Sequence, residues 1–221
     1  MDWARAIEIN RIALARVVAE IFALLGLVAG GTVERLPHGL NQKVERLLRP
    51  AESALRRLIV IAARGLVVKP WSKRVMPEGL KITRKASGRM AFRLFDTRKK
   101  FDFIEVENPL FVKVKTYSSN PFNPFNSLFQ PRPAEQGSAL NAIQLSRRLA
   151  AVAYALETIP RQAQRLARWQ TRRKMMVKPK FTSPLRPGQP PGFRTLPKVD
   201  VDFVLRECHA LAWDAYREDS S

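Results

Sequence analysis

The sequence has few of the residues that carry most enzyme chemistry. It contains one cysteine, Cys208, and two histidines, His38 and His209. A single cysteine excludes an intramolecular disulfide and a metal site built from several thiolates, and it fits a reducing, cytoplasmic compartment. Cys208 and His209 are neighbours in a predicted helix, where adjacent side chains point about 100 degrees apart, so we do not expect a nucleophile and base pair.

Motifs typical of catalytic and nucleotide-binding sites are also missing. The chain has no GxGxxG, GxxxxGK[ST], HExxH or GxSxG pattern. Acidic residues number 19 against 39 Lys and Arg, and most of those in the basic middle lie close to a Lys or Arg. We therefore expect a non-catalytic protein that needs no cofactor or metal, and we infer no small-molecule substrate.

Positive charge is concentrated in the middle of the chain. The formal net charge is +20, which divides into 0 for residues 1–31, +24 for residues 32–199 and −4 for residues 200–221. A charge of this size and sign favours an anionic partner, either nucleic acid or a lipid surface.

The N-terminal apolar segment is short for a membrane span. A helix is predicted over residues 3–29, and its uncharged part, which begins at Ile21, is about 15 Å long against a hydrocarbon core of about 30 Å. Three interpretations stay open: the core of a helical bundle, membrane attachment through residues 12–31, or a cleaved signal peptide. This apolar segment makes the cytoplasmic face of a membrane the preferred location.

Hydrophobic periodicity predicts a mainly helical α+β fold. Further helices are expected at 41–64 with an interruption at Pro50, at 138–176 with a kink at Pro160, and at 201–216. Apolar and polar residues alternate between residues 80 and 117, which predicts a small antiparallel β-meander. The expected segments are an N-terminal helical pair (1–69), the sheet (70–117), a Pro/Asn-rich linker (118–137), the long helix (138–178), a Pro-rich linker (179–199) and a tethered acidic helix (200–221).

The long helix carries the strongest candidate site. Arg161, Arg165, Arg168 and Arg172, called the arginine face below, recur at spacings of 4, 3 and 4, and Arg173 and Lys174 extend the cluster. Such a row falls within about 60 degrees of arc and can contact phosphates of nucleic acid or lipid headgroups. A solvated face, or a face covered by the acidic C-terminal helix on its flexible tether, is the alternative.

Two other surfaces are candidates for binding. A heptad seam of Leu145, Leu149, Val152 and Leu156 predicts lengthwise packing on another helix, and we consider a protein partner there. The polar face of the predicted sheet supplies a possible second anion-binding surface, made of Arg89, Arg93, Lys113 and Lys115.

These patterns favour a binding or scaffold protein at an anionic surface. The apolar N-terminus makes a membrane surface the first hypothesis, because a plain nucleic-acid-binding protein has no use for it. A DNA- or RNA-binding accessory protein is the alternative hypothesis.

Overall fold

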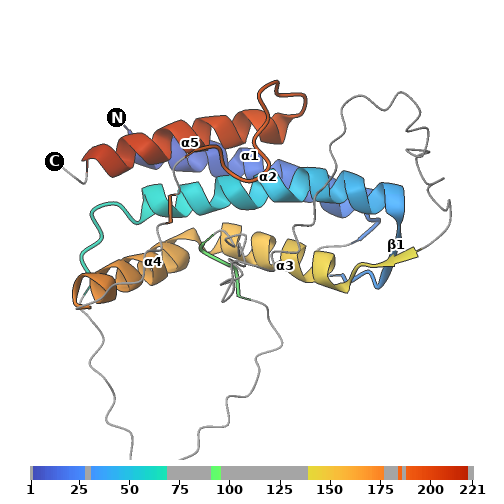
Figure 1. Cartoon of the computed structure of the whole chain (residues 1–221), viewed down its shortest axis with the longest axis horizontal. Helices are drawn as coiled ribbons and strands as arrows, with labels where there is room; N and C mark the ends of the chain where they lie inside the picture. Colours follow the sequence, from blue (N-terminus) through green and yellow to red (C-terminus); the bar gives the residue numbers. More distant parts are fainter. Residues whose placement is uncertain are drawn as a thin grey trace, which may run out of the picture. The chain divides into compact units, whose positions relative to one another are not determined.

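The computed structural model describes residues 2–27, 31–68, 91–95, 139–176, 184–185 and 188–218, all of which belong to one unit formed by Met1–Asp96 and Ala139–Ser221. The elements in chain order (Figure 1) are α1 (Trp3–Leu24), β1 (Arg35–Pro37), α2 (His38–Ala62), β2 (Ala139–Asn141), α3 (Ile143–Glu157), α4 (Ile159–Lys174) and α5 (Asp200–Glu218). The described residues therefore confirm a mainly helical α+β protein with a small antiparallel sheet.

Helix α2 is the centre of this unit. It contacts α1, α3, α4 and α5, and its C-terminal half is buried on almost every side. In Figure 1, α3 and α4 follow one another along one side of α2, and α5 runs along the other side. The apolar residues of this C-terminal half therefore form the middle of the core, while the N-terminal half keeps charged side chains in solvent.

Helix α1 is shorter than the sequence predicts. Its N-terminal cap is Asp2, whose carboxylate accepts a hydrogen bond from the backbone N–H of Arg5 at 3.0 Å. The helix ends at Leu24, because Gly26 already adopts the left-handed conformation at φ 62. Its inner face is buried in the core and consists of Leu14, Val17, Val18, Ile21 and Phe22. This packing supports the bundle-core interpretation of the N-terminal segment.

The predicted interruption of α2 at Pro50 does not occur. The helix is continuous from His38 to Ala62, and Pro50 is buried inside it. The loop before α5 lies directly against this proline: a Cβ added to Gly192 would stand 2.7 Å from the Pro50 nitrogen. Because a proline nitrogen carries no hydrogen, the loop can lie against this position of α2 without leaving a backbone N–H of that residue unsatisfied.

The predicted long helix is divided near Pro160. Thr158, at φ −115 and ψ 34, separates α3 from α4, and Pro160 occupies the first turn of α4. The four seam residues Leu145, Leu149, Val152 and Leu156 are buried in the core of this chain. The partners of α3 are α1, α2 and α4, so the seam offers no exposed surface to a second protein.

The sheet joins segments that the sequence did not predict to be strands. Strands β1 and β2 pair antiparallel, with Leu36 opposite Leu140. The predicted meander at 70–117 lies outside the described residues except for 91–95, which form no strand, and the linker at 118–137 lies outside them entirely. Within 91–95 the predicted alternation is present, since Phe92 and Leu94 are buried and their neighbours are not fully buried.

Helix α5 packs against α2 and α1, so it does not cover the arginine face of α4 as the charges suggested. The predicted inner residues of α5 are buried: Val204, Leu205, Cys208, Leu211 and Ala215. Asp202 in the first turn accepts the backbone N–H of Lys198 at 3.0 Å. The described part of the Pro-rich linker is held on α2, where Ser53 donates a hydrogen bond to the Pro191 carbonyl at 2.7 Å.

Candidate anion-binding surface

The arginine face lies on the outer side of α4, as predicted. Its four residues are exposed, whereas the side of α4 that faces α2 is buried and consists of Ile159, Gln162, Ala163, Leu166 and Ala167. The helical turn of about 100 degrees per residue separates the two sets cleanly. The packing of α4 therefore presents the cations to solvent without using them in the core.

Two of these arginines are positioned by neutral acceptors. Arg161 donates to the Tyr154 hydroxyl at 2.9 Å, and Arg165 donates to the Phe92 carbonyl at 2.9 Å. Arg172 donates weakly to the Arg168 carbonyl at 3.4 Å. Neutral acceptors orient a guanidinium but leave its charge in place, so these bonds fix the face without neutralising it.

No carboxylate among the described residues forms an ion pair with the arginine face. Helix α4 itself contains no Asp or Glu. The carboxylates that do pair with an arginine elsewhere in the described part are Glu8, Glu45, Glu52 and Asp214. The potential above α4 is therefore positive, which attracts anions.

The two residues that extend the cluster lie at the C-terminal end of α4. Arg173 stacks over the Trp169 ring with its guanidinium carbon 5.6 Å from the ring centroid, and that ring packs on Phe95 at 4.6 Å. Lys174 is exposed. Positive charge in the last helical turn also interacts favourably with the helix dipole, which explains part of this cluster without any ligand.

Only Arg93 of the second predicted surface falls within the described residues, and it is exposed. Arg89, Lys113 and Lys115 lie outside them, so the sheet surface stays a prediction. The segment around Arg93 is held against the helices: Arg56 of α2 donates to the Arg93 carbonyl at 2.9 Å, next to the Phe92 carbonyl that Arg165 binds. The structure thus brings one residue of the second surface beside the first.

The sequence prediction missed two apolar residues next to the cluster. Met175 and Met176 directly follow Lys174 and are 65% and 57% exposed. Their spacing continues no apolar face of α4, which is why periodicity did not single them out. The two methionines add apolar, adaptable side chains directly after the cations of α4.

The inner face of α1 is occupied by the core, while Ile12 and Leu24, which lie within the predicted attachment segment 12–31, are 42% and 41% exposed. Among the helices of the described residues, none is both long enough and apolar enough to cross a bilayer.

Cys208 and His209 are engaged in the packing of α5. The Cys208 thiol donates to the Asn10 amide oxygen at 3.4 Å, and burial raises the pKa of that thiol. His209 accepts a hydrogen bond at Nδ1 from the Arg57 guanidinium at 3.1 Å, and burial followed by the charge of Arg57 lowers the pKa of His209. In the described part of the chain, no group of three or more His, Cys, Asp or Glu side chains is arranged to hold a metal ion.

Comparison of the chain with known protein families, with curated proteins and with solved structures found no match. The site therefore has to be judged on its own geometry.

Proposed function

We propose that this chain is a non-catalytic binding protein that attaches to an anionic membrane surface through the arginine face of α4. The observation that supports the proposal is a row of exposed arginines without carboxylate partners among the described residues, followed directly by the exposed Met175 and Met176. Peripheral attachment to membranes commonly combines two such contributions, one electrostatic and one apolar.

The magnitudes are sufficient for reversible attachment. Each basic residue near an anionic lipid surface contributes about 1 kcal/mol, and the arginine face with Lys174 supplies five such residues. Full burial of one methionine side chain adds roughly 1.5–3 kcal/mol. The sum covers a substantial part of the rotational and translational entropy that a protein loses on binding.

The proposed membrane contact lies on α4 and not on the N-terminal segment. The proposed cellular location, the cytoplasmic face of a membrane, is the one that the sequence predicts. The core covers the apolar face of α1, so we assign the contact to the C-terminal half of α4. Anionic lipids are enriched in the cytoplasmic leaflet of cell membranes, which makes that leaflet the expected surface.

A DNA- or RNA-binding accessory protein is the second candidate. It is favoured by the straight row of guanidinium groups on α4 and by the absence of acidic residues from this helix, features that suit a row of phosphates. The two candidates differ in what they require of the methionines, because phosphate binding gains nothing from them.

The test is cosedimentation of the full chain with phosphatidylcholine vesicles that contain or lack phosphatidylserine, run beside a gel-shift assay with duplex DNA and with single-stranded RNA. The variant is R161Q/R168Q/R172Q, which spares Arg165 because that residue holds the Phe92 carbonyl. The charge-matched control is R5Q/R16Q/R35Q, whose three arginines are exposed and form no described ion pair. A second variant, M175S/M176S, removes only the apolar contribution.

We expect the full chain to sediment only with phosphatidylserine vesicles, and each α4 variant to reduce that binding by about tenfold or more while the control does not. The second candidate would be favoured if the full chain bound nucleic acid but not vesicles, and if M175S/M176S bound nucleic acid as tightly as the full chain. Absence of binding to every probe would eliminate both.

A further inference from the structure

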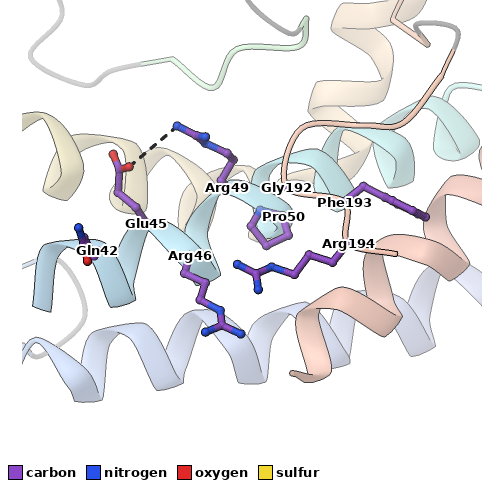
Figure 2. A pocket seen from close by; sticks show the side chains of 8 residues that line it. All are labelled: Gln42, Glu45, Arg46, Arg49, Pro50, Gly192, Phe193 and Arg194. Carbon is purple, nitrogen blue, oxygen red and sulfur yellow. Dashed lines mark ion pairs between the residues drawn. The ribbon is translucent and has the colours of Figure 1, made fainter. Parts of the chain in front are cut away.

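A surface pocket lies where the loop before α5 crosses α2. Its volume is about 450 Å³, and side chains of α2 and of residues 192–194 line it (Figure 2). Sites for small molecules typically enclose about 300–1,000 Å³. Gly192 makes the close crossing possible, because its φ of 84 suits glycine and a Cβ there would collide with Pro50.

Three arginines surround this pocket, and two of them form no ion pair with a described carboxylate. Arg49 pairs with Glu45 at 3.9 Å, and Glu45 is shared with Arg148 of α3 at 3.4 Å. Figure 2 shows Arg49 turned toward Glu45, while Arg46 and Arg194 extend along the other side of α2. No described carboxylate forms an ion pair with Arg46 or Arg194.

The loop that supplies Arg194 is held in place by bonds that need no ligand. Arg206 of α5 donates to the Arg194 carbonyl at 3.1 Å and lies over the Phe193 ring, 5.4 Å from its centroid. The Ser53 hydroxyl fixes the Pro191 carbonyl from α2. The backbone from which Arg194 extends toward the pocket is thus preorganised, which lowers the entropy lost on binding.

The rest of the lining is mixed: Pro50 supplies an apolar wall, while Gln42 is polar and Glu45 is the acid that pairs with Arg49 and Arg148. Phe193 also belongs to the lining, but Figure 2 shows its ring extending away from Pro50, and the ring lies near His209 with the two centroids 6.3 Å apart. Guanidinium groups bind phosphate oxygens through paired N–H donors, whereas an aromatic or proline ring favours a flat apolar group. The pocket therefore combines contacts for two parts of one molecule.

We propose that this pocket binds a small organic phosphate, with the phosphate at Arg46 and Arg194 and an apolar moiety against Pro50. This site is separate from the arginine face, and it does not depend on the proposed membrane attachment. The sequence suggested no small-molecule ligand because Arg46 and Arg194 are far apart in the chain and neither belongs to a basic run.

The test is isothermal titration calorimetry of the full chain with phenyl phosphate, inorganic phosphate and phenol at low salt. We expect saturable binding of phenyl phosphate, weaker binding of inorganic phosphate and none of phenol. R46Q/R194Q should weaken phenyl phosphate binding by about tenfold or more, since each lost charge-assisted contact accounts for a large part of a small ligand's affinity.

The charge-matched control is R5Q/R147Q, which removes two exposed arginines that neither line the pocket nor belong to the arginine face, and it should leave phenyl phosphate binding unchanged. Far-UV circular dichroism confirms that each variant stays folded. The proposal is overturned if no probe binds saturably, if R46Q/R194Q binds phenyl phosphate as tightly as the full chain, or if the control variant weakens it equally.

Discussion

Two regions of this molecule use arginine in opposite ways. Between α2 and α3, Arg148 makes two hydrogen bonds to Glu52, at 2.9 and 3.2 Å, and Glu52 also pairs with Arg56 at 3.6 Å. On α4, the arginine face has no such carboxylate among the described residues. The residue type is the same, so the position of the carboxylates decides whether an arginine joins two helices or stays available to a ligand.

The arginines of the two regions also differ in burial: the paired arginines are more buried than those of the arginine face. The side chains of Arg56 and Glu52 are 10% and 13% exposed, and Arg57, one residue further, is 1% exposed. The residues of the arginine face are exposed. Charged groups leave water only where partners compensate them, so Arg56 and Arg57 should contribute to folding and the α4 arginines should not.

The largest expected effect comes from one substitution made in each region. Arg57→Ala removes the donors to the Ser53 carbonyl and to His209 and opens a cavity in the core, so we expect a loss of about 3 kcal/mol in the free energy of unfolding. Arg168→Ala on α4 should change it by less than about 0.5 kcal/mol. Urea denaturation of both variants measures the difference, and equal losses would break the comparison.

A smaller effect is expected from the carboxylate of the paired region. Glu52→Gln removes the negative charge that Arg148 and Arg56 pair with and one of the two oxygens that Arg148 binds, and because Glu52 is mostly buried we expect a loss of about 2 kcal/mol. Glu20→Gln, on the exposed side of α1, is the control and should be nearly neutral. If thermal denaturation shows the same midpoint for both variants, the network between α2 and α3 does not stabilise the fold.

The smallest expected effect concerns pH. Burial, and then the charge of Arg57, lowers the pKa of His209 below its ordinary value of 6.5, and the hydrogen bond from Arg57 requires Nδ1 to be unprotonated. The unfolded chain therefore binds this proton more readily than the folded chain does. The contribution of His209 to stability is complete above pH 6.5 and is lost as the pH falls through the folded pKa.

The comparison that isolates this contribution is His209→Asn, which keeps an acceptor near Nδ1 and does not titrate. Between neutral and mildly acidic pH, the free energy of unfolding of the unmodified chain should fall more steeply than that of the variant. Parallel curves would show that His209 does not titrate differently in the two states.

The sequence predicted which face of each helix is buried better than it predicted which element packs on that face. The exposed arginines of α4 and the buried side of α5 follow from helical spacing, which is a local property. Pro160 predicted a kink in one long helix, whereas the structure has two helices, α3 and α4, separated at Thr158. The strand pair β1 and β2 has only three residues on each side, so it left no alternating pattern to detect.

Long-range packing explains the remaining differences. Pro50 was expected to interrupt a helix, yet the neighbouring loop with Gly192 packs on it and α2 continues. Charge predicted that α5 would lie on α4, but burial of its apolar face placed it on α2 and α1. Apolar area buried in a continuous core outweighs the attraction of solvent-exposed charges, which is screened by water and salt.

The most direct test of the central claim is a salt titration of binding to phosphatidylserine-containing vesicles, measured for the full chain and for R161Q/R168Q/R172Q. If the α4 arginines are available for an anionic surface, the affinity of the full chain falls steeply as salt increases. The variant should bind more weakly at low salt and show a flatter dependence, while its free energy of unfolding stays unchanged. Superimposable titrations of the two proteins would contradict the account, because the exposed arginines of α4 would then make no contact with the membrane.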